Sequence, residues 1–152
     1  MAKTEIRNQA DERRKLKQFL TRYYRSKERQ AILQDRLAKL RHDLQRHGNV
    51  ATTEIAEIEA RINRQAERDG KIILEIMDVL DLLPDGSTER TILELRHIDC
   101  KPWTEIQRAV HFTRTPCFDY YNRGLDKLLE HPEVHKRLAK DKAFSAGKNA
   151  DV

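Results

Sequence analysis

The spacing of apolar residues near the start of the chain places the strongest constraint on its fold. Over residues 11–46 they recur every three or four positions, at Leu16, Phe19, Leu20, Tyr23, Leu33, Leu37, Leu40 and Leu44. This spacing is typical of one long helix that packs against a second helix along an apolar seam. Ser26 and Gln30 occupy seam positions in the middle, so we expect the pairing there to be loose or made by other residues.

A second helical pattern follows a break at His47, Gly48 and Asn49. Thr52 or Thr53 can cap the new helix, and carboxylates over residues 54–59 suit its positive end. Its seam positions are Ile55, Ile58, Ile62, Ile72 or Ile73, Ile76, Val79 or Leu80, and Leu83, with interruptions at Gln65, Asp69 and Gly70.

Charge differs sharply between these two predicted helices. Residues 1–50 hold 14 Lys and Arg against 6 Asp and Glu, a net charge of +8, whereas residues 51–86 hold 4 against 9, a net charge of −5. Opposite charges favour antiparallel packing into a helical hairpin, although each exposed ion pair contributes little. The same seam serves pairing between two copies of the chain, so hairpin and dimer remain alternatives that can coexist.

Composition extends the helical prediction to the whole chain. Hydrophobic residues make up 38% and charged residues 36%, which suits long solvated helices better than a sheet protein. We therefore expect an all-α protein. The turn residues Pro84, Asp85 and Gly86 end the second helix, which gives three regions: a helical arm over residues 1–84, a domain over residues 85–140, and a flexible tail over residues 141–152.

The sequence lacks the signals that are typical of several classes of protein. Cys100 and Cys117 share no metal-ligand spacing and are too few for a disulfide framework. No apolar run approaches the roughly 20 residues that cross a bilayer, and the first 14 residues lack the apolar core of a signal peptide. The chain has no glycine-rich phosphate loop, nucleophile elbow or zinc-binding histidine spacing. We expect a cytoplasmic protein that is not an enzyme and has no metal or cofactor.

The region after Gly86 reads as three shorter helices. Ser87 or Thr88 can cap the first, which runs to about Ile98; the second begins at Trp103, and the third covers residues 114–129. A tight turn over residues 111–113 joins the last two. Two short helices, a tight turn and a third helix form the skeleton of a helix-turn-helix.

Side chains of this region have predicted roles in packing and capping. Thr113 can cap the third helix, Pro116 is tolerated in its first turn, and Trp103 should pack the junction of the first two helices. Tyr120 is expected in the core, with Tyr121 left open. Close packing of the last two helices should involve Ile106, Ala109, Val110, Phe112, Cys117 and Tyr120.

Residues 89–129 resemble region four of bacterial sigma factors. The resemblance lies in Trp103-Thr-Glu-Ile106, in Phe112-Thr-Arg114, and in Gly124-Leu125-Asp-Lys127-Leu128, which align without a gap with the apolar-x-Glu-Ile, Ile-Ser-Arg and Ala-Leu-x-Lys-Leu landmarks of that family. With its long amino-terminal helices, the chain looks like phage and prophage transcription regulators of the ArpU and RinA type. The resemblance covers about 40 of the 152 residues.

The resemblance implies that the third helix enters the major groove of DNA. By position its DNA-facing residues are Arg114, Thr115, Phe118, Asp119, Asn122 and Arg123. Phe118 could contact a thymine methyl, Asp119 could accept from cytosine N4, and Asn122 could pair with adenine. The basic residues from Arg13 to Arg29 could add phosphate contacts, although such a run is usually a solvated helix face.

The sequence therefore predicts a site-specific double-stranded DNA-binding transcription regulator, which the resemblance places among activators of phage late genes in a bacterial host. A homodimer through the helical arm and a contact with RNA polymerase are the expected protein partners. Two alternatives remain: a small phage packaging (terminase) subunit, and a helical protein-interaction module whose helix-turn-helix does not bind DNA.

Overall fold

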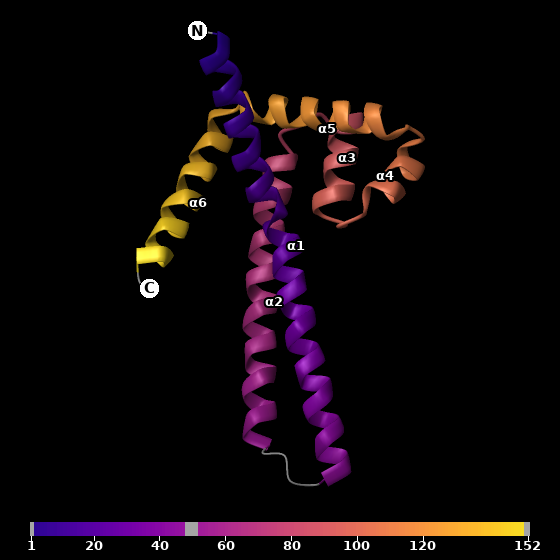
Figure 1. The fold of residues 1–152 in the computed structure, drawn as a ribbon, viewed down its shortest axis with the longest axis vertical. Coiled ribbons are helices and arrows are strands. Elements are labelled where there is room, and N and C mark those ends of the chain that lie inside the picture. Colours follow the sequence, from indigo (N-terminus) through magenta and orange to yellow (C-terminus); the bar gives the residue numbers. More distant parts are fainter. Residues whose placement is uncertain (1, 48–51, 151–152) are drawn as a thin grey trace. The chain divides into compact units, whose positions relative to one another are not determined.

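Helix is the regular secondary structure throughout the described part of the chain. The structure, a computed structural model, describes the backbone of residues 2–47 and 52–150 and the side chains of residues 5–46 and 52–141. Its helices are α1 (Ala2–His47), α2 (Thr52–Leu80), α3 (Thr88–His97), α4 (Trp103–Val110), α5 (Arg114–Leu129) and α6 (Pro132–Ala150) (Figure 1). The predicted all-α class is confirmed. Gly48 and Asn49, where a break was predicted, lie outside the described residues.

Contacts divide the chain into two compact units. One comprises residues 22–74, and the other comprises residues 1–21 together with residues 75–152. The division falls inside both long helices, whereas the boundary predicted from the turn residues lies after Pro84, where α2 has already ended. Below, the first is called the hairpin unit and the second the composite unit.

Helix α1 begins nine residues earlier than predicted, at Ala2 instead of Asp11. The prediction relied on apolar spacing, and the first fully buried side chain of α1 is Leu16. Residues 2–10 contain neither glycine nor proline, and most are good helix formers such as Ala, Lys, Glu, Arg and Gln. Helical propensity therefore extends α1 beyond its buried face.

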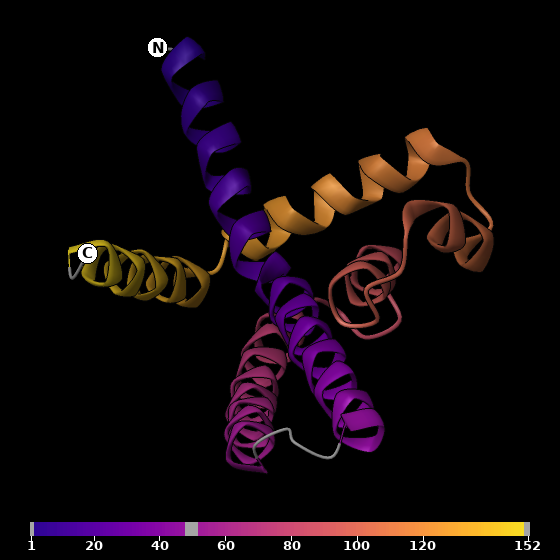
Figure 2. The ribbon, with the colours of Figure 1, turned by 60° about the horizontal axis from the view of Figure 1, so that its bottom comes forward.

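The hairpin unit pairs α1 with α2 in antiparallel fashion, as Figures 1 and 2 show. Ser26 of α1 hydrogen-bonds to Asp69 of α2, and Arg41 Nη2 donates to Glu59 Oε1 over 2.6 Å. Later residues of α1 thus meet earlier residues of α2, as an antiparallel arrangement requires. The chain thus forms the predicted hairpin, and pairing between two copies stays a prediction.

A buried polar cluster replaces apolar packing in the middle of this seam. Ser26, Gln65 and Asp69 are each at most 7% exposed. Gln65 Nε2 donates to Ser26 Oγ over 2.6 Å and to Asp69 Oδ1 over 3.0 Å, and the Ser26 hydroxyl donates to the same carboxylate oxygen. Of the two possibilities considered for this stretch, these contacts favour pairing made by other residues, since Ser26, Gln65 and Asp69 bond to one another.

The composite unit has a continuous apolar core to which all of its helices contribute. Its buried side chains are Leu16, Phe19, Leu20, Ile76, Val79, Leu80, Leu83, Ile92, Leu93, Ile106, Cys117, Tyr121, Leu125, Leu128 and Val134. At roughly 1.5–3 kcal/mol for each large aliphatic or aromatic side chain, this burial is the main favourable term for folding. The start of α1 is thus part of the core around α3 and α5.

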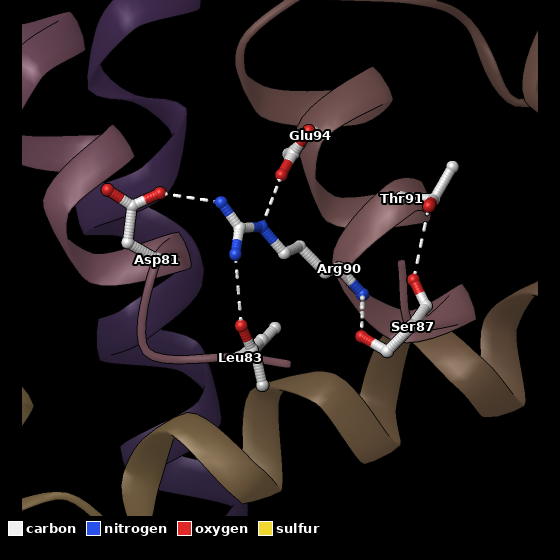
Figure 3. A network of polar contacts seen from close by, with 6 residues as sticks. All are labelled: Asp81, Leu83, Ser87, Arg90, Thr91 and Glu94. Carbon is white, nitrogen blue, oxygen red and sulfur yellow. Dashed lines mark hydrogen bonds and ion pairs between the residues drawn. The ribbon is translucent and has the colours of Figure 1, made fainter. Parts of the chain in front are cut away.

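Arg90 fixes the connection between α2 and α3 (Figure 3). Its guanidinium donates to Glu94 Oε1 over 2.6 Å, to Asp81 Oδ1 over 2.7 Å and to the Leu83 carbonyl over 3.1 Å. Ser87 caps α3 as predicted, since its hydroxyl accepts from the Arg90 amide. The hydrogen bond with Glu94 raises the pKa of Arg90. The three hydrogen bonds of the guanidinium tie the end of α2 to α3.

Helix α6 was not predicted from the sequence. It begins at Pro132, a favourable residue for the first turn of a helix, and it buries Val134. The predicted flexible tail over residues 141–152 is helical as far as Ala150, and its side chains beyond Asp141 lie outside the described residues. None of the helices in the described residues has the length and apolar content needed to span a membrane.

Candidate nucleic-acid interface

Helix α5 packs one face against the rest of the composite unit. Its buried residues, Cys117, Tyr121, Gly124, Leu125 and Leu128, recur at helical spacing. Figure 1 shows α5 lying across the ends of α3 and α4. The opposite face of α5 is therefore the one directed away from the core.

Gly124 allows α5 to approach α3 closely. A Cβ atom at this position would lie 2.7 Å from Leu93 Cδ1 and 3.2 Å from Glu89 Cβ, both on α3. The first separation is shorter than real Cβ contacts, so a larger residue would require the Leu93 side chain or the helices to shift. Gly124 thus sets the distance between α5 and α3.

A three-residue turn joins α4 to α5. His111 follows α4 in the left-handed conformation, with φ 60° and ψ 37°, which costs a non-glycine residue about 1 kcal/mol. The Phe112 amide donates to the Gln107 carbonyl and the Cys117 amide to the Thr113 carbonyl, so backbone bonds define both ends of the turn. Thr113 stands at the predicted N-cap position of α5, but its side chain makes no capping hydrogen bond.

The packing predicted between α4 and α5 is correct only in part. Ile106 and Cys117 are buried and Val110 is half-buried, as expected, but Ala109 is exposed and Phe112 is 37% exposed. Helix α4 has only eight residues and turns a single apolar row inward. Ala109 and Phe112 lie outside that row.

Trp103 is a packing residue, as predicted, with partners on other helices. Its ring centroid lies 4.5 Å from that of Phe118 and 5.1 Å from that of Tyr121, both on α5. The Arg96 guanidinium of α3 lies 5.2 Å from the Trp103 ring. Phe118, predicted to face DNA, is consequently half-buried against Trp103.

The prediction that Tyr120 lies in the core is wrong, and Tyr121, whose placement was left open, is the core residue. Tyr121 is 5% exposed and belongs to the core, whereas Tyr120 is half-buried, 5.2 Å from the Phe112 ring. The reason is the orientation of α5, whose inward face includes the residue four positions after Cys117. The Tyr121 hydroxyl is also hydrogen-bonded in the core, 2.8 Å from His97 Nε2.

His97 is buried and uncharged at neutral pH. Burial lowers its pKa to about 3, and the positive charge of Arg96 also lowers it. A hydrogen bond with the Leu20 backbone raises the pKa but does not outweigh these two effects. Burial likewise raises the pKa of Tyr121 to about 12. The pair therefore joins α1, α3 and α5 as neutral partners.

The outward face of α5 carries a stripe of polar side chains at spacings of four, three and four residues: Thr115, Asp119, Asn122 and Asp126. We call these four residues the outward stripe. Thr115 and Asp119 are exposed, and Asn122 is half-buried. Three of the six predicted DNA-facing residues therefore lie on this stripe.

The two predicted arginines flank the stripe and are exposed. Arg114, in the first turn of α5, lies 5.3 Å from the Phe118 ring. Arg123 lies 5.1 Å from the Tyr120 ring and 3.9 Å from Glu89 Oε1. Both side chains keep guanidinium groups at the surface on either side of the polar residues.

Asp126, at the end of the stripe, is bound by Arg13 of α1. Arg13 Nε and Nη2 donate to the two carboxylate oxygens over 2.6 and 2.5 Å, a bidentate pair with both side chains 32% exposed. This hydrogen bonding raises the pKa of Arg13. Sequence reasoning missed this contact because 113 residues separate the two, and no local pattern links them.

Glu89 of α3 carries a buried charge beside α5. It is 7% exposed, and Lys127 Nζ donates to its Oε1 over 3.2 Å. Burial alone would raise the pKa of this carboxyl group, but hydrogen bonds with its backbone and Lys127 and the nearby positive charges outweigh it, so the pKa is lowered. The positive charge of Lys127 on α5 is thereby neutralised by the buried carboxylate of Glu89.

The part of the chain that the structure describes offers no group of three or more His, Cys, Asp and Glu side chains arranged to hold a metal ion. Comparisons of the chain with protein-family models, with curated proteins and with solved structures found no match. The geometry of α4 and α5 and the residues of the outward stripe are therefore the features that bear on function.

Proposed function

We propose that the protein is a site-specific double-stranded DNA-binding transcription regulator in which α4 and α5 form a helix-turn-helix and α5 is the recognition helix. The observation that carries the proposal is the outward stripe. A short helix, a three-residue turn and a second helix present it at the surface while the opposite face of α5 is anchored in the core. A helix presented in this way fits the major groove of B-DNA.

Five residues of α5 have defined roles in the proposal. Arg114 and Arg123 bind phosphates, and Asn122 pairs with the edge of an adenine. Asp119 accepts from cytosine N4, which makes it a specificity residue that repels incorrect bases. Phe118 keeps its place against Trp103, so a thymine methyl can reach only the exposed part of its ring.

The resemblance to region four of sigma factors agrees with this arrangement. Its apolar landmarks Ile106, Leu125 and Leu128 are all buried, as a shared packing scheme requires. A role in activating phage late genes and a contact with RNA polymerase follow from that resemblance. The hairpin unit would then serve homodimerisation, and two copies would read two half-sites.

The first experiment measures binding of the purified protein to labelled fragments from its own genomic neighbourhood, by fluorescence anisotropy with random DNA as competitor. Saturable binding to one fragment that resists the competitor, and that weakens steeply as salt rises, is the expected result. Equal binding to every fragment would favour the packaging-subunit alternative, and no binding at low salt would refute the proposal.

Two substitutions separate the roles of the stripe and its flanks. Arg114→Ala should weaken binding to all sequences and lower the salt dependence by about one unit of slope. Asn122→Ala should leave the salt dependence unchanged and relax preference at one base pair by about 1–3 kcal/mol. An unchanged affinity of the Arg114→Ala protein would mean that α5 does not enter the groove.

One observation favours a second candidate function, a protein-interaction module without DNA binding. Asp119 is exposed at the centre of the stripe, where it would oppose the negative charge of DNA at most sequences. Under this second candidate, Asp119→Lys would create DNA binding that the natural chain lacks. Under the main proposal it would change the preferred sequence of an existing binder.

A further inference from the structure

Helix α1 crosses α5 where the outward stripe ends. Arg13 reaches Asp126, the last residue of the stripe, and the earlier turns of α1 continue past α5 in Figures 1 and 2. Residues 2–21 and α5 belong to the same compact unit, so this crossing is part of one packed structure. The first three turns of α5 remain uncovered by the Arg13 contact.

The length of the stripe locates this crossing relative to bound DNA. Eleven residues separate Thr115 from Asp126, which corresponds to about 16 Å along a helix. The major groove is only about 12 Å wide. With the first turns of α5 in the groove, Asp126 would lie at its rim, where the phosphate backbone runs.

A row of basic residues lines the part of α1 next to this crossing. Lys17 Nζ lies 5.6 Å from the ring of Tyr121 on the inward face of α5. Lys17, about one turn after Arg13, therefore also lies beside α5. Arg14 precedes Lys17 by three residues and Arg7 precedes Arg14 by seven, so all three share one face of the helix.

The charges of this row are available to a ligand. Arg7, Arg14 and Lys17 are exposed. Arg14 pairs with Asp11 within α1, but both side chains are largely exposed, and a pair of this kind contributes little. Arg13 meanwhile neutralises Asp126, which removes a carboxylate that would repel a phosphate at the same place.

We propose that Arg7, Arg14 and Lys17 of α1 bind DNA phosphates at the rim of the groove that α5 enters, with Arg13 as the positioning residue that holds α1 there. This inference rests on the proposed function and extends it: the DNA-binding surface comprises the start of α1 as well as α4 and α5. A phosphate contact adds affinity without sequence preference.

The test measures binding of a labelled mixed-sequence DNA duplex by fluorescence anisotropy over a series of salt concentrations. Three double variants of the full chain are compared with the natural protein. Arg7→Gln/Arg14→Gln removes two charges from the row. Arg36→Gln/Arg64→Gln removes two exposed charges from the hairpin unit and is the matched control for net charge. Arg7→Lys/Arg14→Lys retains the charges.

Each lost phosphate contact lowers the slope of log affinity against log salt by about 0.9. The Arg7→Gln/Arg14→Gln protein should therefore lose about two units of slope and roughly tenfold or more in affinity. The matched control should keep the natural slope, and the lysine variant should restore most of it. Glutamine and lysine are both good helix formers, so α1 is preserved.

Two outcomes would overturn the inference, and they differ in what they mean for the proposed function. If the natural protein binds DNA and Arg7→Gln/Arg14→Gln has the same slope as the matched control, α1 makes no phosphate contact, although the proposed function stands. If the natural protein binds no DNA at low salt, the proposed function fails and this inference fails with it.

Discussion

Acid should weaken the composite unit through His97. In the unfolded chain this imidazole has a pKa near 6.5 and takes up a proton below that pH, whereas in the folded protein its pKa of about 3 keeps it neutral. The unfolded state therefore binds more protons between these values, so the free energy of unfolding falls as pH falls, by about 1.4 kcal/mol per unit. From pH 7 to pH 5 the expected loss is about 2 kcal/mol.

Urea unfolding at pH 7 and pH 5, for the natural protein and for His97→Gln, isolates this contribution. Glutamine keeps a hydrogen-bond donor and acceptor near Tyr121 but does not titrate. Carboxylates contribute to the pH dependence of both proteins and cancel in the comparison. The natural protein should lose about 2 kcal/mol more than the variant between the two pH values.

Equal losses for the two proteins would refute the reasoning. An NMR titration gives an independent check, because the ring resonances of His97 should remain those of a neutral imidazole at pH 5. If the His97 resonances titrate with a pKa near the unperturbed value of about 6.5, the ring is solvated and Leu20 and Tyr121 do not enclose it.

Four substitutions test the packing and capping described above. Gly124→Ala should lower the free energy of unfolding by about 1 kcal/mol, because the contact with Leu93 costs about 1–3 kcal/mol and improved helix propensity returns about 1; a more stable variant in urea would disprove the close approach of α3 and α5. Ser87→Ala should cost about 1 kcal/mol, whereas Thr113→Ala should cost under about 0.5, since only the first side chain caps its helix; equal shifts in thermal unfolding would contradict this. Asp69→Ala should cost about 1–3 kcal/mol by removing the acceptor of two buried hydrogen-bond donors; a fully exposed cluster would instead give a change within about 0.5 kcal/mol.

Apolar spacing predicted the helices of this chain well because burial and helical period are coupled. Leu16, Leu20 and Leu37 are buried on one face of α1, at the positions that the seam pattern predicts. The same reasoning misplaced Tyr120 of α5. Periodicity gives the set of residues on one face, but Trp103 and His97, which lie on other helices, select Tyr121 over Tyr120 as the core residue.

The candidate site shows the same limit of local patterns. The side chains of Thr115, Asp119 and Asn122 could be assigned to one stripe of α5 from spacing alone. The ion pair of Arg13 with Asp126 could not, because it depends on how α1 crosses α5. Sequence reasoning consequently treated the start of α1 as part of a separate arm, whereas contacts place it in the unit that contains α5.

The discontinuous composite unit has a consequence for synthesis on the ribosome. Arg13 emerges 113 residues before Asp126, its partner. At about 5–20 residues per second, the start of α1 waits roughly 6 to 20 seconds before the helix that it packs against has been made. The hairpin unit, whose paired segments are both complete by residue 74, can form during that interval. Until residues 75–129 have been made, we expect Leu16, Phe19 and Leu20 to lack part of the core that buries them, which leaves an apolar surface that a chaperone can bind.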